Sequence, residues 1–376
     1  MLTRRQFSVS AGAAALACFG SARAQGAGKI ILGQSAAFTG PAAQLGIQFN
    51  RGAQVWFDQL NAQGGVNGKT IDIKKMDDGY EPDRCAANTI KLIDSGVFAL
   101  FGYVGTPTSL AAMPMVKAAQ IPFIAPFTGA MGLRDPANKM VFHLRASYDD
   151  ETALIVKQLT NLGLKKIAVF YQNDAYGQAG LDGVKKALDA QNLIPVALAT
   201  VERNSVDVAA AVKTLTAASA DAIVQISAYK SSAAFIRASR QSGYRGSYYN
   251  VSFVGTQALS SELGKDAAGV MVSQVMPSPF DAARPISREF AAAVKAAGGD
   301  AQVNFSSMEG YLAAKLFTEG LRRAGPNPTR DGLVRGIEAI GAQSMGGFAI
   351  NFSPSSHVAS KFVELSMLTA DGRVMT

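Results

Sequence analysis

The chain has 376 residues, of which 48% are hydrophobic, 17% charged and 8% aromatic, and its formal net charge is +8. This composition excludes a disordered chain, a collagen-like repeat and a coiled coil, and the two cysteines are too few for a disulfide framework or a cysteine-rich zinc module. Because a domain usually has about 100–200 residues, the length predicts two or three structural units.

Residues 1–24 are predicted to be an export signal. They combine a basic head containing Arg4 and Arg5, a short apolar run and an Ala-x-Ala end at Ala24, which are the three parts of a secretory signal peptide. The adjacent arginines resemble a twin-arginine export signal. We expect cleavage near Ala24 and a periplasmic protein, with a lipoprotein acylated at Cys18 as the alternative. No later apolar stretch is long enough to span a bilayer, so the mature protein is predicted to be soluble.

Along the rest of the chain, short apolar or β-branched runs alternate with longer amphipathic stretches. Strands are expected at 30–32, 70–76, 97–101, 166–171, 194–201 and 221–226, and helices at 47–60, 83–93, 180–190 and 231–241. Strands that alternate with helices of this length form βαβ units. The sequence therefore predicts an α/β fold with parallel sheets.

The predicted units are too many for one sheet, and we place a boundary at residues 144–151. A strand is expected to end there, and Asp149 or Asp150 can cap the helix that follows. Prolines mark a second crossing at 276–280. The expected division is a first lobe of residues 25–144 with about 280–345, and a second lobe of residues 145–275 with about 353–376.

Two further helices are expected at 288–297 and 307–324, where no strands lie nearby in the sequence to partner them. We expect these helices to cover the first lobe. Ligands of parallel α/β sheets bind beyond the carboxyl ends of the strands, so two facing lobes define a cleft.

Motifs of catalysis are missing from the sequence. Residues 63–70 differ from a phosphate-binding loop at the first position and precede a strand, whereas such a loop opens a helix. Residues 227–230 match the serine–lysine pattern of β-lactamases, but the motifs that accompany it are absent. The only histidines are His143 and His357, and His143 alternates with apolar neighbours as a structural strand residue does. Basic residues are dispersed, which argues against nucleic-acid binding. We expect neither an enzyme nor a cofactor or metal site.

One loop with the polarity of a ligand site follows the strand that ends at Phe101. It enters a helix through Gly105 and Thr106. The free backbone N–H groups of a helix start, together with the Thr106 hydroxyl, can cradle a carboxylate. A capped helix start without a ligand is the alternative interpretation.

A second loop of this kind covers residues 124–130. Phe127 can supply an apolar contact there, and Thr128 and the Gly129 backbone can supply polar contacts. Here too, the alternative is a structural loop without a ligand.

Several motifs carry a family resemblance. They are Gly33–Pro41, Asn61–Lys69, the pair Asp77-Asp78 followed by Pro82, and Gly177 after Tyr176. In this order, through the mature chain, they resemble the branched-chain amino-acid-binding family, the type I periplasmic binding proteins of ABC importers. The resemblance implies two Rossmann-like lobes joined by a multi-strand hinge, which close around a small ligand. It also implies a monomer that delivers the ligand to a membrane permease.

The same resemblance assigns residues to the site. It places Thr106 and Thr128 near the carboxylate and ammonium ends of the ligand, in the first lobe. From the second lobe it nominates Tyr148, Tyr176, Tyr229, Ser252 and Phe253.

Two departures from the family pattern affect the expected ligand. Ser252 takes the place of the acidic residue that pairs with a ligand ammonium group, and an unpaired buried ammonium is costly. The family disulfide is missing, because the position that would pair with Cys85 is Gly105. With Tyr103, Phe127, Tyr176 and Phe253 available, an aromatic or other apolar carboxylate is an alternative to an amino acid. A sensory subunit that reports a ligand to a regulator is an alternative to transport.

Overall fold

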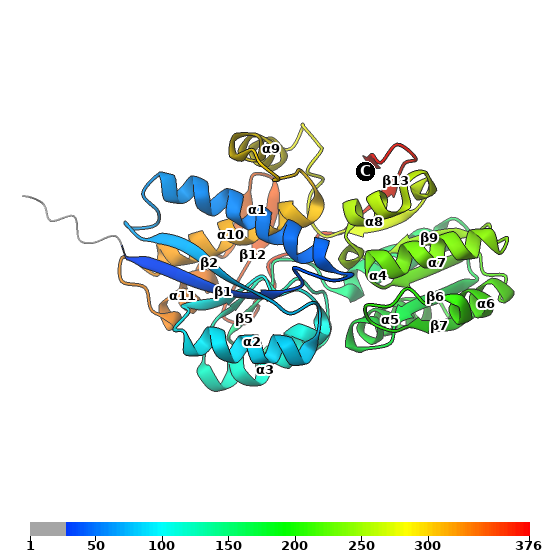
Figure 1. Ribbon diagram of the computed structural model, residues 1–376, viewed down its shortest axis with the longest axis horizontal. Coiled ribbons are helices and arrows are strands. Elements are labelled where there is room, and N and C mark those ends of the chain that lie inside the picture. The colour runs from blue at the N-terminus through cyan, green and yellow to red at the C-terminus, as the bar shows by residue number, and fades with distance from the viewer. Residues whose placement is uncertain (1–27) are drawn as a thin grey trace, which may run out of the picture.

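The structure is a computed structural model that describes residues 28–376; the expected export signal, including Cys18, lies outside these residues. The described chain forms two lobes that lie side by side (Figure 1), each built on one sheet. None of the helices in residues 28–376 combines the length and the apolar character that a membrane crossing requires.

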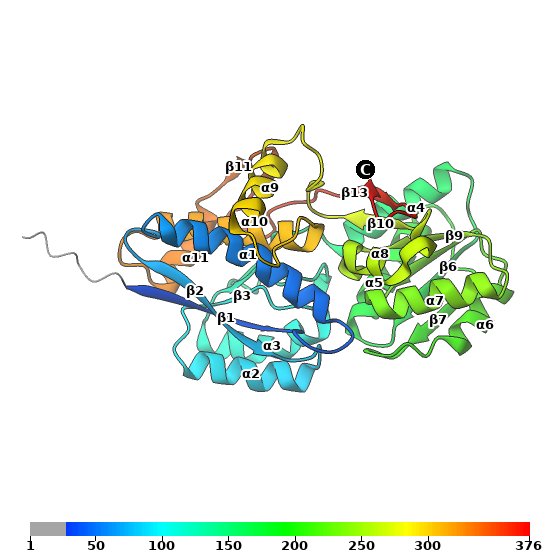
Figure 2. The same cartoon turned by 45° about the horizontal axis from the view of Figure 1, so that its top comes forward.

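The first lobe is built on five parallel strands in the order β2-β1-β3-β4-β5. Its strands are β1 (Lys29–Ala36), β2 (Thr70–Asp77), β3 (Ala99–Phe101), β4 (Phe123–Ile124) and β5 (Val141–Phe142). Its helices are α1 (Ala43–Ala62), α2 (Pro82–Asp94), α3 (Thr106–Ala119) and the 3-10 helix η1 (Met131–Leu133). Helices α2 and α3 pack together over one face of the sheet, with α1 on the opposite face (Figures 1 and 2).

The second lobe has a sheet in the order β14-β13-β10-β9-β8-β6-β7, parallel except at β13 and β14. Its strands are β6 (Ile167–Gln172), β7 (Leu198–Val201), β8 (Ala222–Ile226), β9 (Ser247–Asn250), β10 (Met271–Gln274), β13 (Glu364–Leu368) and β14 (Val374–Met375). Its helices are α4 (Tyr148–Asn161), α5 (Ala175–Asp189), α6 (Ala209–Ala217), α7 (Tyr229–Gln241), α8 (Thr256–Leu263) and the 3-10 helices η2 (Ser252–Val254) and η3 (Gly264–Ala267).

The chain then returns to the first lobe. It forms α9 (Pro285–Ala297), α10 (Phe305–Arg323), α11 (Arg330–Glu338) and a hairpin of β11 (Ala342–Met345) and β12 (Phe348–Asn351). Helix α10 packs closely along α1 because both helices carry glycine at the contact: a Cβ on Gly52 would lie 1.8 Å from the Ser307 carbonyl oxygen, and one on Gly310 would lie 1.9 Å from that of Phe49.

Three segments cross between the lobes: residues 143–147, 275–284 and 352–363. The first and third run side by side, because His143 forms a parallel bridge with Val358 and its carbonyl accepts the N–H of Ala359 at 2.8 Å. Hydrogen-bonded crossings of this kind form a hinge between the two sheets.

Two local expectations are wrong in detail. The N-cap of helix α4 is Ser147, whose hydroxyl accepts the N–H of Asp150, and Asp150 completes a capping box by accepting the Ser147 N–H at 2.9 Å, whereas Asp149 has no capping role. Strand β7 begins at Leu198 instead of residue 194, because Pro195 has no N–H to donate to a strand ladder.

Candidate ligand-binding cleft

The strand-to-helix loops at the carboxyl ends of the two sheets meet between the lobes, and this interface is called here the cleft. All eleven residues nominated from the sequence are buried there or nearby, and none of them is more than 8% exposed where a fraction is given. They are Tyr103, Gly105, Thr106, Phe127, Thr128, Gly129, Tyr148, Tyr176, Tyr229, Ser252 and Phe253. The lobes of this structure are therefore in contact over the cleft.

The first-lobe wall is polar and built from short side chains. The Thr106 and Thr128 hydroxyl oxygens lie 2.7 Å apart, and the Ala130 N–H donates to Thr128 Oγ1 at 3.2 Å. Thr106 is the first residue of α3, whose start is not capped by any side chain. Pro107 follows and has no N–H, so the helix start offers the N–H groups of Thr106 and Thr108.

The two glycines of the first-lobe wall allow aromatic rings to approach the backbone. Gly105 has a φ of +103°, and a Cβ there would lie 2.2 Å from Tyr80 Cε2. A Cβ on Gly129 would lie 2.6 Å from Tyr148 Cδ1. Any side chain at either position would displace a ring.

Five aromatic residues from both lobes meet in the cleft and are called here the aromatic cluster: Tyr80, Phe127, Tyr148, Tyr176 and Phe253. Ring centroids of Phe253 lie 4.5 Å from Tyr176, 5.7 Å from Phe127 and 5.8 Å from Tyr80, and Tyr148 lies 5.5 Å from Tyr176. Tyr80 and Phe127 belong to the first lobe, so Phe253 contacts rings across the cleft. The Tyr80 hydroxyl accepts the Gln172 side-chain N–H at 3.2 Å, also across the cleft.

Two nominated residues lie away from this cluster. Tyr103 is outside the cleft: its hydroxyl lies 3.1 Å from Thr89 Oγ1, and its ring packs against Phe123 at 5.0 Å, in the layer below α2 and α3. The structure thus separates Tyr103 from the other nominated residues, because the positive φ of Gly102 interrupts the alternation of strand faces. Tyr229 is the buried first residue of α7, where burial raises its pKa and a hydrogen bond with the backbone of Gln44 opposes the rise.

Ser252 is held by a buried acid that the sequence analysis did not nominate. Glu151 Oε2 accepts the Ser252 N–H at 2.7 Å and the Ser273 hydroxyl at 2.5 Å, and Glu151 Oε1 accepts the Ser252 hydroxyl at 3.0 Å. Burial raises the pKa of Glu151, while Arg145 and these serine donors oppose the rise. The carboxylate is therefore close to Ser252 but already engaged.

A buried ion pair closes the hinge end of the cleft. Arg145 binds Glu309 through two hydrogen bonds of 2.8 and 2.7 Å, and its guanidinium lies 4.1 Å above the Phe127 ring centroid. Burial lowers the pKa of Arg145, and Glu309 more than restores it, so the net shift is upward. Arg145 Nη1 has no hydrogen-bond partner in residues 28–376. A small cavity beside this pair is also lined by Ser252 and Gln274.

Polar contacts also join the lobes at the outer edge of the cleft. Arg203 of the second lobe lies 2.9 Å from Glu81 of the first lobe and 3.2 Å from Asp174. Asn204 donates to the Gly79 carbonyl at 3.0 Å and to Glu81 at 2.7 Å. We call these contacts the Arg203 latch.

Tyr80, Arg145, Glu151 and Glu309 are site residues that the sequence analysis missed. Tyr80 had a local signal, because it stands in a loop directly after a predicted strand. The two acids had none, because Glu151 bonds to a residue 101 positions away and Glu309 to one 164 positions away.

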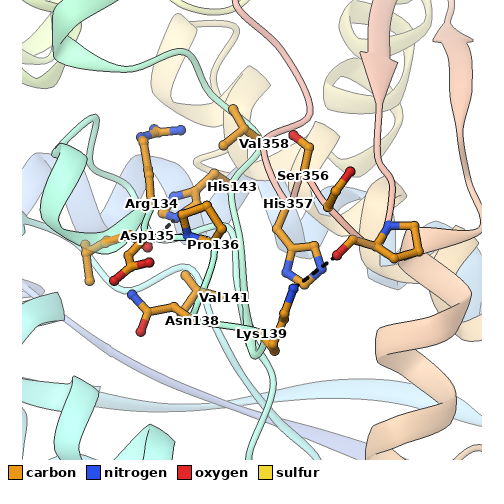
Figure 3. Close-up of a pocket in the computed structure, with 13 residues that line it drawn as sticks. Arg134, Asp135, Pro136, Asn138, Lys139, Val141, His143, Ser356, His357 and Val358 are labelled. Carbon is orange, nitrogen blue, oxygen red and sulfur yellow. Dashed lines mark hydrogen bonds between the residues drawn. The ribbon is translucent and has the colours of Figure 1, made fainter.

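A separate pocket of ≈ 410 Å³ lies beside the hinge and contains none of the nominated residues (Figure 3). Both histidines line it. His143 Nε2 lies 3.1 Å from the Leu133 carbonyl, and burial lowers the His143 pKa well below its ordinary value. His357 stacks on Phe142 at 4.0 Å and bonds to Glu338 at 3.0 Å. Both rings therefore have structural partners.

No cluster of three or more metal-binding side chains occurs in the described part of the chain.

Residues 29–373 match the profile of a family described as periplasmic binding protein. A possible leucine/isoleucine/valine-binding protein from Rhodopirellula baltica is similar at 31% identity and a TM-score of 0.88, covering 93% of this chain and 97% of that one. A substrate-binding periplasmic protein from Ralstonia solanacearum is similar at 32% identity and a TM-score of 0.87, covering 92% and 99%.

An amino acid binding protein from Pseudomonas aeruginosa is 25% identical over 237 residues, which are 62% of this chain. The match spans 63% of the length of that relative.

Proposed function

The chain belongs to the periplasmic binding protein family, and on that premise we propose that it captures an amino acid or a related small carboxylate for an ABC importer. Its relatives are named as binding proteins, and the chain is a binding protein rather than an enzyme. The family name implies a location outside the cytoplasm. In this proposal the export signal is cleaved near Ala24, and the mature protein acts in the periplasm as a monomer that docks on a membrane permease.

One observation carries the proposal: α3 begins without a side-chain cap, inside the cleft. The N–H groups at this helix start carry the positive end of the helix dipole, and the paired hydroxyls of Thr106 and Thr128 lie beside them. A carboxylate bound there receives charge-assisted hydrogen bonds, each of which contributes about 1.5–3 kcal/mol. The aromatic cluster supplies apolar contact for the remainder of the ligand.

Closure follows from differential affinity. Phe127 and Tyr80 of the first lobe contact Phe253 of the second only when the lobes meet. A ligand that bridges the Thr106–Thr128 pair and this cluster binds the closed form more tightly than the open form, and only that difference can shift the equilibrium. The permease then recognises the closed protein.

The test uses the mature protein expected after cleavage of the export signal. Residues 25–376 are purified from an expressing host, and co-purifying small molecules are identified by mass spectrometry and returned to ligand-stripped protein by calorimetry. At about a hundredfold excess over the dissociation constant, the ligand should stabilise the fold by about 2.7 kcal/mol.

A matched pair of variants tests the polar wall. Thr106→Val keeps the shape but removes the hydroxyl, and we expect an affinity loss of about 10–100-fold. Thr214→Val is the control, because the Thr214 hydroxyl bonds only to its own helix, at the Ala210 carbonyl, on an exposed surface. Unchanged affinity in Thr106→Val would contradict the assignment of the carboxylate to this wall.

A further inference from the structure

Resting on the proposed function, we propose that the cleft selects an aromatic monocarboxylate that carries no ammonium group. The inference comes from an inventory of the acidic side chains around the cleft. A zwitterionic amino acid needs a carboxylate to pair with its buried ammonium, since an isolated buried charge is strongly unfavourable.

Glu151 is the acid nearest to the position of Ser252, and both of its oxygens already accept hydrogen bonds from the protein. Three donors converge on them: the Ser252 N–H, the Ser252 hydroxyl and the Ser273 hydroxyl. The side chain is fully buried at 0% exposure. Glu151 therefore fixes the second-lobe loop at Ser252 instead of presenting a charge to the ligand.

Glu309 and Asp174 are engaged as well. Both Glu309 oxygens accept from Arg145. Asp174 Oδ1 caps α5 by accepting the Tyr176 N–H at 2.9 Å, and its Oδ2 binds Gln172 at 2.6 Å and Arg203 at 3.2 Å. At the rim, Glu81 is taken up by the Arg203 latch. Each of these carboxylates already has a partner within the protein.

Within the described chain, the unpartnered buried atoms of the cleft include the acceptor Gln172 Oε1, but no carboxylate oxygen is among them. Arg145 Nη1 and the Tyr176 hydroxyl are buried and have no partner in residues 28–376. The uncapped start of α3 adds further N–H donors. A surplus of donors over free anionic acceptors favours an anion and disfavours a second, positive end on the ligand.

The ring geometry supports an aromatic body for this anion. Phe253 is the centre of the aromatic cluster, with three ring neighbours at centroid distances of 4.5 to 5.8 Å in tilted orientations. Such tilted ring contacts are favourable beyond the burial of apolar area alone. Phe127 and Phe253 stand on different lobes and contact each other directly at 5.7 Å, so a ligand ring would replace this contact and join the two lobes in its place.

Paired ligands isolate the ammonium group. Calorimetry on ligand-stripped protein compares 3-phenylpropanoate with phenylalanine, and 4-methylpentanoate with leucine; the members of each pair differ only in the α-ammonium. We expect each deaminated acid to bind at least about tenfold more tightly than its amino acid, and 3-phenylpropanoate to bind more tightly than 4-methylpentanoate.

The outcomes separate this inference from the proposed function. If phenylalanine or leucine binds as tightly as its deaminated partner, the inference is overturned while a solute-binding role stands. If 4-methylpentanoate binds more tightly than 3-phenylpropanoate, the aromatic part is overturned. If none of the four compounds binds, and no other amino acid or carboxylate co-purifies, the proposed function itself fails.

A variant tests the aromatic preference by a different route. Phe253→Leu keeps apolar volume but removes the central ring, and we expect about a fivefold loss for 3-phenylpropanoate with little change for 4-methylpentanoate. Phe235→Leu is the control: Phe235 stacks on Phe170 at 4.3 Å in the core of the second lobe, so this change should leave the ratio of the two affinities as it was. An equal loss for both acids in Phe253→Leu would contradict the inference.

Discussion

The two walls of the cleft are built on opposite plans. In the first lobe, α3 begins at Thr106 without a side-chain cap, and glycines keep the wall thin. In the second lobe, the helices that carry Tyr148 and Tyr176 are capped by Ser147 and Asp174. A capped helix start has satisfied its own N–H groups and can carry a ring, whereas an uncapped start still has N–H groups to offer. Helix α7, which begins at Tyr229 in the second lobe, also lacks a side-chain cap. The contrast therefore holds for the helix starts at Thr106, Tyr148 and Tyr176, where the first lobe offers N–H groups and the second lobe mainly offers rings.

The largest expected effect comes from the ion pair between the walls. Replacing Arg145 by Met leaves the Glu309 carboxylate buried at 3% exposure without its partner. We expect Arg145→Met to lower the free energy of unfolding by about 3–5 kcal/mol, measured by urea denaturation. The double variant R145M/E309L should recover most of this loss, because it removes both charges together. If the double variant is as unstable as the single one, the ion pair stabilises the fold by more than the mutual compensation of its two charges.

The thin first-lobe wall is tested at Gly105. A Cβ there meets the Tyr80 ring at 2.2 Å on a backbone with a φ of +103°. We expect Gly105→Ala to cost about 2–3 kcal/mol of stability and to weaken ligand binding. Gly163→Ala is the matched control, since Gly163 has a φ of +77° and open space around it; it should cost only about 1 kcal/mol. Equal losses of stability in the two variants would mean that the Tyr80 ring moves aside for the added Cβ at little cost.

The pH dependence of stability is tested beside the first-lobe wall, at adjacent aspartates. Burial raises the pKa of Asp78 to about 6, and hydrogen bonds lower that of Asp77 to about 2 although burial opposes them. The folded state binds a proton at Asp78 more readily than the unfolded chain does. The contribution of Asp78 to the free energy of unfolding therefore rises by roughly 2 kcal/mol as the pH falls from 7 to about 4. Asp77 acts in the opposite sense, and only below about pH 4.

Asp78→Asn should therefore flatten the change in urea midpoint between pH 7 and pH 4.5. Asp77→Asn should leave that interval unchanged and alter the profile at lower pH. The assignment would be contradicted by an unchanged slope in Asp78→Asn.

The smallest expected effect is at the Arg203 latch, which spans the outer edge of both walls. Arg203 is 24% exposed, so its ion pairs are partly screened, and each contributes less than about 1 kcal/mol. We expect Arg203→Ala to weaken ligand binding by about two- to fivefold by destabilising the closed form, with little effect on unfolding. Arg322→Ala is the control, because Arg322 pairs only within its own helix, with Glu319 at 3.8 Å. Equal ligand affinity in the two variants would exclude a role of the latch in closure.

Local features of the sequence predicted much of the fold and the loops that form the candidate site. The alternation of apolar runs and amphipathic stretches indicated parallel sheets, because the hydrophobic periods of strands and helices can be recognised from residues close in the sequence. Thr106, Phe127 and Thr128 were found because they follow strands, and parallel strands bring their carboxyl ends to one edge. The structure adds that Thr106 and Thr128 touch, at 2.7 Å between hydroxyls.

Only the tertiary structure decided which charges are available to a ligand. Two sets of contacts depend on segments that meet across the fold. Arg145 pairs with Glu309, and Glu151 accepts hydrogen bonds from Ser252 and Ser273. Tyr103 lies outside the cleft, because the positive φ at Gly102 places its side chain on the other face of the sheet. Sequence records periodicity and turn chemistry over a few residues, whereas burial and pairing of charges are set by contacts between distant segments. The sequence by itself therefore determined that a ligand cleft is expected and where its loops lie, and the tertiary structure decided its electrostatic character.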